Sequence, residues 1–115
     1  MITIPIDTSR SSHFTLSVNL DEIVCNFRFL WNLRDECWYC DFSSSNGQNN
    51  GVRIVRETGL LGNRSNLGAD GDFRVLKVNR TAKDHITYDN FGSDYILVWA
   101  TSAEWEEFDG LRNDV

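Results

Sequence analysis

The sequence predicts an all-β fold: a small antiparallel β-barrel or sandwich of about six to eight strands with a short C-terminal helix. Apolar side chains alternate with polar ones at a period of two, and clusters of turn-forming residues separate these stretches. The chain has 115 residues, of which 41% are hydrophobic and 12% aromatic, enough to build a buried core without disulfides. We expect a single domain over residues 1–115, with its core in about 1–100 and a short helix and acidic tail over 101–115.

The first part of the chain carries the clearest alternation. Its apolar sets are Ile2, Ile4 and Ile6, then Phe14, Leu16, Val18 and Leu20, then Cys25, Phe27, Phe29, Trp31 and Leu33. Polar residues stand between them, with Leu30 as the exception in the longest set. Residues 13–43 therefore predict a three-stranded antiparallel meander.

Cys37-Trp38-Tyr39-Cys40 is a Cys-x-x-Cys motif, which raises the question of a redox or zinc site. In an extended strand, residues three apart point to opposite faces and their Cα atoms lie about 10 Å apart, too far for a disulfide. No helix start follows that would activate a thiol. A second ligand pair for zinc is also missing, since only Cys25, His13 and His85 remain. The strand interpretation is favoured, and three cysteines without a secretion signal indicate free thiols.

The middle of the chain predicts a hairpin followed by an irregular connection. Residues 43–51 (SSSNGQNNG) contain Asn46-Gly47 and indicate a hairpin tip. Val52, Ile54 and Val55 predict a short strand after it, and glycines then interrupt residues 57–72. We expect Leu60 and Leu61 to anchor that connection to the core.

The last part of the chain predicts two strands, a polar connection and a helix. Phe73, Val75, Leu76 and Val78 mark one strand, and residues 94–100 (DYILVWA) mark a central strand buried on both faces. Between them, residues 85–88 (HITY) suggest a short strand and 90–92 a turn. Thr101 with Glu104 three residues later predicts an N-cap, Trp105 and Phe108 have helical spacing, and Gly110 is expected just after the last turn.

Other residues that might carry chemistry have simpler interpretations. His85 stands in a polar stretch and is expected in a surface loop without a nucleophile signature. A calcium site could be assembled only from Asp70, Asp72, Asp84, Asp89 and Asp94, which lack the EF-hand order. Glu104, Glu106 and Glu107 fit the wet face of a helix better than a glycosidase pair. The glycines of 59–71 match no phosphate-binding fingerprint. We expect no catalytic, cofactor-binding or metal site.

The charge balance limits the possible partners. Seventeen acidic and eleven basic residues give a net charge of -6, which disfavours binding to nucleic acid or anionic membranes. No signal sequence or membrane span is predicted, so synthesis in the cytosol is expected.

The four tryptophans divide into two pairs. Trp31 and Trp38 are expected to face each other across a hairpin. Trp99 and Trp105, around the start of the C-terminal segment, are candidates for filling an interface with a partner.

Several of these motifs, taken in order, resemble baseplate plug proteins of contractile-tailed phages, of the kind described in a cyanophage. The resemblance rests on ITIPID at the start, Phe27-x-Phe29-x-Trp31-Asn32-x-Arg34, Trp38-Tyr39-x-Asp41, Gly51 to Val55 with Leu60-Leu61, and Phe91 to Trp99. It covers about residues 1–100. Cys37, Cys40 and the tail from Thr101 depart from the family pattern.

The resemblance implies a compact, non-enzymatic β domain at the hub or spike of the baseplate that closes the distal end of the tail tube. Its implied partners are hub, spike and tube-initiator proteins, and its implied location is the virion. The alternative left open is a β-sandwich that binds a carbohydrate or small ligand through exposed aromatics. A third possibility, a cysteine-dependent redox or metal protein, depends on Cys37 and Cys40.

Overall fold

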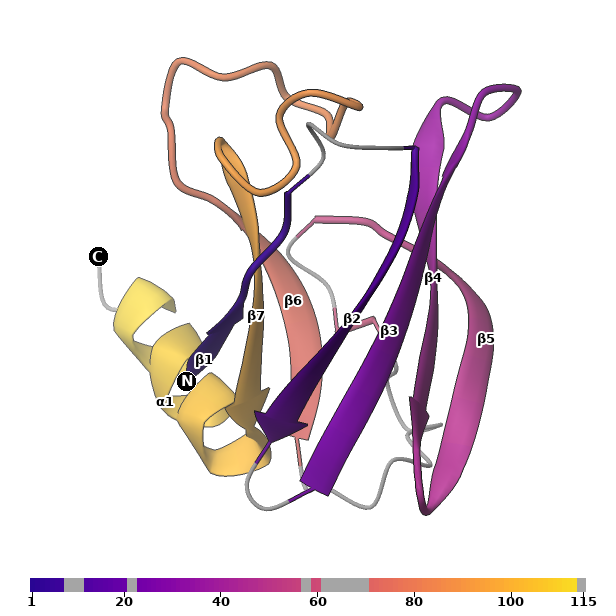
Figure 1. Ribbon diagram of the computed structural model, residues 1–115. Coiled ribbons are helices and arrows are strands. Elements are labelled where there is room, and N and C mark those ends of the chain that lie inside the picture. The colour runs from indigo at the N-terminus through magenta and orange to yellow at the C-terminus, as the bar shows by residue number, and fades with distance from the viewer. Residues whose placement is uncertain (8–11, 21–22, 57–58, 61–70, 114–115) are drawn as a thin grey trace.

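The computed structural model describes residues 1–7, 12–20, 23–56, 59–60 and 71–113, which form seven strands and one helix (Figure 1). The elements are β1 Ile2–Ile4, β2 His13–Leu20, β3 Ile23–Asn32, β4 Cys37–Ser44, β5 Gly47–Arg53, β6 Gly71–Lys77, β7 Tyr95–Thr101 and α1 Ser102–Asn113. Two antiparallel sheets, in the orders β1-β7-β6 and β2-β3-β4-β5, make an open sandwich. The predicted all-β fold with a short C-terminal helix is confirmed, in its sandwich form.

The β2-β3-β4-β5 sheet is built from consecutive hairpins, and the predicted meander over 13–43 is confirmed. Leu16 lies opposite Phe27, Phe27 opposite Phe42, and Trp31 opposite Trp38. The period-two pattern sets these pairs, because all inward side chains of neighbouring strands must meet on one face.

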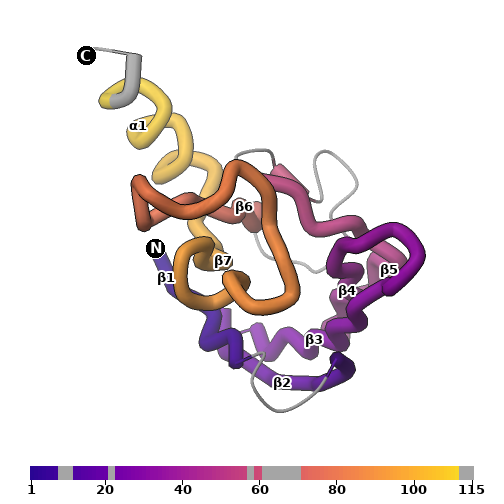
Figure 2. Tube along the Cα trace, turned by 90° about the horizontal axis from the view of Figure 1, so that it is seen from above, coloured from indigo at the N-terminus to yellow at the C-terminus, as the bar shows by residue number. Residues whose placement is uncertain are grey.

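Strand β7 is the centre of the other sheet, between β1 and β6. As predicted, it is covered on both faces. Tyr95, Leu97 and Trp99 belong to the core between the sheets, whereas Val98 and Ala100 pack under α1. Figure 2 shows α1 on the outer side of this sheet, away from β2-β3-β4-β5.

The core between the sheets is mainly aromatic. Its fully buried side chains include Phe27, Phe29, Trp38, Phe42, Phe73 and Phe91. Phe27 and Phe42 from one sheet contact Phe73 from the other, with ring centroids 5.4 and 4.8 Å apart. Such contacts add about 1 kcal/mol each beyond area burial. The predicted facing of Trp31 and Trp38 is also confirmed, at 5.5 Å between centroids.

The hairpin between β3 and β4 corrects the prediction that Leu33 continues the inward apolar face. Leu33 is 84% exposed. The side-chain oxygen of Asn32 accepts hydrogen bonds from the backbone N–H groups of Arg34 and Asp35, at 2.9 and 3.0 Å. This Asx-type turn ends the strand before Leu33, and Glu36 completes the turn with a positive φ of 52°.

The prediction for residues 43–51 is also corrected, because most of this stretch is strand. Only Ser45 and Asn46 separate β4 from β5, with Ser44 paired to Gly47. The expected strand at Val52, Ile54 and Val55 is displaced accordingly, since β5 ends at Arg53.

A β-bulge interrupts the pairing of β4 with β5, where the register shifts between Cys40 and Phe42. Gly51 takes a φ of 66° there, and its N–H donates to Asp41 Oδ1 at 2.7 Å. A left-handed residue in the longer strand is typical of the glycine bulge.

Strands β6 and β7 are joined by residues 78–94, hereafter the β6–β7 loop. The predicted strand at 85–88 is absent from it. The Asn90 side chain instead accepts from Thr87 N at 2.7 Å and donates to the His85 carbonyl at 3.1 Å. The predicted turn at 90–92 is confirmed, with a φ of 99° at Gly92.

Helix α1 begins as predicted. Thr101 Oγ1 accepts from Glu104 N at 3.2 Å, and Glu104 Oε1 accepts from Thr101 N at 3.1 Å, which is a capping box. The predicted end is wrong, because the helix continues through Gly110 to Asn113. Arg74 on β6 forms two hydrogen bonds with Asp109, at 2.7 and 3.1 Å, and ties the last turns to the sheet.

Candidate functional site

The three cysteines are free, and each is buried. Cys40 points into the core beside Phe42 and Trp38, whereas Cys37 lies three residues away on the opposite face of β4. Burial raises the pKa of the Cys40 thiol far above its usual range, and it raises the pKa of Cys25. Thiols that stay protonated are poor nucleophiles and poor metal ligands. The strand interpretation of the Cys-x-x-Cys motif is confirmed.

Cys37 lines a shallow hollow of about 220 Å³ together with Glu36, Arg53, Arg56 and His85. Acidic and basic side chains both border this hollow, so it has no clear charge preference. His85 is exposed on the β6–β7 loop, as predicted. His13, the other histidine, lies on β2 in the opposite half of the sandwich.

The acidic residues of the second half do not converge. Asp70 lies outside the described residues. Among the described ones, no group of three metal-ligating side chains is found. Asp94 accepts from Asn79 Nδ2 at 2.9 Å, and Asp72 accepts from Phe73 N at 2.7 Å. Asp89 is exposed on the loop. Asp94 and Asp72 thus each serve their own turn or strand end.

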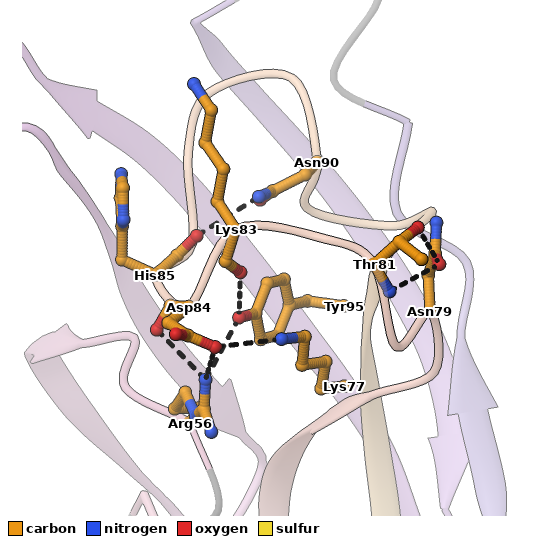
Figure 3. Close-up of polar contacts among 9 residues, drawn as sticks. All are labelled: Arg56, Lys77, Asn79, Thr81, Lys83, Asp84, His85, Asn90 and Tyr95. Carbon is orange, nitrogen blue, oxygen red and sulfur yellow. Dashed lines mark hydrogen bonds and ion pairs between the residues drawn. The ribbon is translucent and has the colours of Figure 1, made fainter.

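Asp84 is neutralised by two cations (Figure 3). Its Oδ1 accepts from Lys77 Nζ at 2.9 Å and lies 3.8 Å from Arg56 Nη1. The hydrogen bond from Lys77, followed by the charges of Lys77 and Arg56, lowers the pKa of this carboxyl. A carboxylate held ionised in this way is unsuited to general acid catalysis.

The β6–β7 loop is held from below by a polar network (Figure 3). Tyr95 Oη donates to the Lys83 carbonyl at 2.5 Å, and Arg56 Nη1 donates to the Asp84 carbonyl at 2.9 Å and to Tyr95 Oη at 3.2 Å. Asn90, only 7% exposed, closes the far end. The network pairs the backbone carbonyls of Lys83, Asp84 and His85 with side chains of Tyr95, Arg56 and Asn90.

The glutamates of α1 have helix-specific roles or face solvent. Glu104 accepts from the amino group of Met1 at 2.6 Å and takes part in the capping box. The Met1 amino group, followed by the Thr101 N–H, lowers the pKa of Glu104. Glu106 and Glu107 are exposed, which fits the predicted wet face.

The prediction that Trp99 and Trp105 are available to a partner is not met in this chain. Both are 4% exposed. Trp99 belongs to the core between the sheets, while Trp105 packs from α1 against Val98 and Ala100 of β7 and donates to the Asp72 carbonyl at 2.9 Å. The two rings lie on opposite faces of β7, so they could not form one patch.

The open face of the β2-β3-β4-β5 sheet carries a polar surface that the sequence did not single out. A shallow hollow of about 450 Å³ crosses it, lined by Thr15, Ser17, Asn26, Arg28, Asp41, Ser43, Gln48 and Asn50. All of the chain's aromatic side chains are described, and each is buried or partly exposed. Tyr39, which is partly exposed, lines a second hollow on this face. The ligand-binding alternative relied on more fully exposed rings than these.

Comparison with known proteins identifies a family. The family model described as "Cyanophage baseplate Pam3 plug gp18" matches residues 1–103. No curated protein matches the chain. The matched residues include all seven strands and only the first two residues of α1. No helix in the described part of the chain is long and apolar enough to span a membrane.

Proposed function

The chain belongs to the cyanophage baseplate plug family, and on that premise we propose that it closes the distal end of the tail tube, at the hub or spike. Membership makes it a structural protein of the virion, located in the tail baseplate and assembled with other baseplate proteins. The match over residues 1–103 is the observation that carries this proposal, because it spans both sheets.

The packing supports a role as a passive obstruction. The space between the sheets is filled with fully buried aromatic side chains, and close-packed interiors deform little. The molecule measures 39 × 34 × 20 Å along its principal axes. Its broadest face sets the size of opening that one copy can cover, so a wider lumen requires several copies.

The charge also suits a position on the path of the genome. At a net charge of -6, the protein repels the phosphate backbone and should not retain DNA that passes it. Affinity for DNA would be a disadvantage at the end of a tube that must empty.

We further propose that the protein has no enzymatic activity and acts as one domain. The protonated thiols of Cys25 and Cys40 and the ion-paired Asp84 support the first point. Contacts across the core from Phe27 and Phe42 to Phe73 support the second, because they join the two sheets. The partners we propose are the hub, the spike and the tube-initiator proteins.

Electron cryo-microscopy of extended and contracted tails tests the position. We expect density that fits the two sheets at the distal end of the tube in extended tails and absent from the axis after contraction. Density for this chain at the baseplate periphery, with an open tube end, would overturn the proposal. It would leave the family assignment intact.

A further inference from the structure

Four strands form the edges of the two sheets, namely β1, β6, β2 and β5. An edge strand exposes unpaired backbone N–H and C=O groups, and proteins usually protect such edges by shortness, proline, bulges, charges or a covering segment. The four edges of this sandwich differ in that protection.

Three edges carry a recognisable device. β1 has three residues, and Pro5 follows directly. β6 is covered by a bridge from Arg56 to Val75 and by a hydrogen bond from Leu60 N to the Phe73 carbonyl at 2.9 Å. β5 contains the bulge at Gly51.

Within the described part of the chain, β2 has none of these devices. It is eight residues long, reads HFTLSVNL, and contains no proline, glycine, Asp, Glu, Lys or Arg. Its register with β3 is regular from His13 to Leu20. A long, regular edge strand without Asp, Glu, Lys or Arg invites pairing with another chain.

The hydrogen-bonding pattern between β2 and β3 determines which backbone N–H and C=O groups of β2 point away from β3. Trp31 N donates to the Ser12 carbonyl at 2.8 Å, so even-numbered residues bond to β3 in this antiparallel pair. The N–H and C=O groups of Thr15, Ser17 and Asn19 therefore point away from the sheet. In the described ranges, no backbone hydrogen bond from another segment reaches them.

The inward side chains of β2 are also incompletely covered. Phe14, Leu16 and Val18 pack against the core but remain partly exposed. A further strand beside β2 would cover their open sides and extend the apolar underside of the sheet.

The charge near one end of β2 indicates what kind of strand fits. Arg28 lies opposite Thr15 on the exposed face, and its Nε contacts His13 Nε2 at 3.4 Å. No ion pair joins Arg28 to a carboxylate within the described part of the chain. Asp41 lies opposite Arg28 on β4, but its Oδ1 accepts a hydrogen bond from Gly51 N at 2.7 Å. Arg28 is therefore a basic side chain on the β2 side of this face, and an acidic side chain beside β2 would complement it.

We propose that β2 accepts an extended segment of a neighbouring baseplate protein as a fifth strand, with an acidic side chain of that segment beside His13 and Arg28. The partner class rests on the proposed function. The edge itself is a property of the fold.

Hydrogen exchange of the protein in isolated baseplates and in its free form tests the added strand. We expect the peptide covering residues 12–20 to exchange at least tenfold more slowly in baseplates, because the outward N–H groups of Thr15, Ser17 and Asn19 become bonded. Equal exchange in both forms overturns the inference. Absence of the protein from baseplates contradicts the proposed function instead. Equal protection in concentrated free protein identifies a second copy as the occupant and overturns the heterologous partner.

Substitutions at Ser17 separate the backbone from the side chain. Ser17→Pro removes an outward N–H that no neighbour uses, so the fold should tolerate it as edge strands tolerate proline. Its incorporation into baseplates should fall roughly tenfold. Ser17→Ala keeps the N–H and should incorporate normally. Normal incorporation of a folded Ser17→Pro protein overturns the inference.

Arg28 supplies a second test that does not depend on tolerance of proline. Arg28→Gln removes the positive charge without placing a second carboxylate opposite Asp41, and it should lower incorporation, whereas Arg28→Lys should preserve it. Incorporation of Arg28→Gln at the wild-type level overturns the acidic partner.

Discussion

The two faces of β7 bury comparable apolar strips in different ways. The inward face, with Leu97 and Trp99, belongs to a large core that joins both sheets. The outward face, with Val98 and Ala100, is covered by α1 through Trp105 and partly buried neighbours. The strands that cover the inward face all lie within the family match of residues 1–103. Most of α1, which covers the outward face, lies beyond that match. The helix is thus an addition to a sandwich whose main core does not include it, and the two clusters should differ in their effect on global stability.

The largest expected loss of stability follows from a substitution in the core between the sheets. Trp38→Ala should lower the free energy of unfolding by about 4 kcal/mol, because it empties a fully buried site among aromatic rings. Chemical denaturation measures the loss. Leu33→Ala, in the adjoining turn and 84% exposed, is the matched control and should cost less than about 0.5 kcal/mol. Similar losses in both variants would contradict the assigned core.

Trp105→Ala tests the outward side. We expect α1 to lose about 3 kcal/mol of local stability, measured by faster amide exchange over residues 102–113, while exchange in β3 changes little. Leu111→Ala, on the same helix but 65% exposed, should leave both unchanged. If β3 and α1 lose protection together, the two clusters form one cooperative unit and the contrast between them fails.

Thr101→Ala should have a smaller effect, confined to the start of α1. Removing the hydroxyl that accepts from Glu104 N should cost about 1 kcal/mol. Helical circular dichroism during thermal unfolding follows the loss. Thr101→Ser keeps the acceptor and should behave as wild type, so a serine variant as unstable as the alanine one would argue against capping.

Acidification should cause the smallest change in stability, and the change should begin in α1. The folded pKa of Glu104 is lowered from 4.5, so its stabilising contribution is complete above pH 4.5 and is lost as pH falls through the lower folded value. Amide exchange in α1 should therefore accelerate below about pH 4.5 before exchange in β3 does. Glu104→Gln removes this titration, and an unchanged pH profile in that variant would assign the effect to another group.

The sequence predicts the sandwich well where one alternating pattern decides the outcome. The apolar patterns of β2, β3 and β7 predict which side chains of each strand are buried. The spacing of Thr101 and Glu104 predicts where α1 begins. These features depend on neighbouring residues along the chain, so local reasoning finds them.

The errors arise where a distant partner or a side chain competes with local preference. Asn32 ends β3 before Leu33, and Asn90 holds residues 85–88 out of a strand. Pairing with β4 extends the turn-rich stretch into β5. Arg74, 35 residues away in sequence, holds Asp109 and carries α1 past Gly110.

The candidate docking edge was missed for a related reason. The sequence predicts β2 as a strand, but its position at the margin depends on the order of the strands in the sheet. The contact between Arg28 and His13 likewise follows from cross-strand register. An uncharged alternating strand was the available signal, and it becomes informative only when the other three edges are known.

The buried sulfurs have a consequence for a particle that persists outside its host. A virion carries no reductase of the host to repair oxidised thiols, and oxidation attacks exposed thiolates first. Cys25 and Cys40 are at most 1% exposed and their pKa values are raised. In aerated water, these two residues should therefore keep the chemical form in which the chain folded, and tails should age without cross-links at these positions.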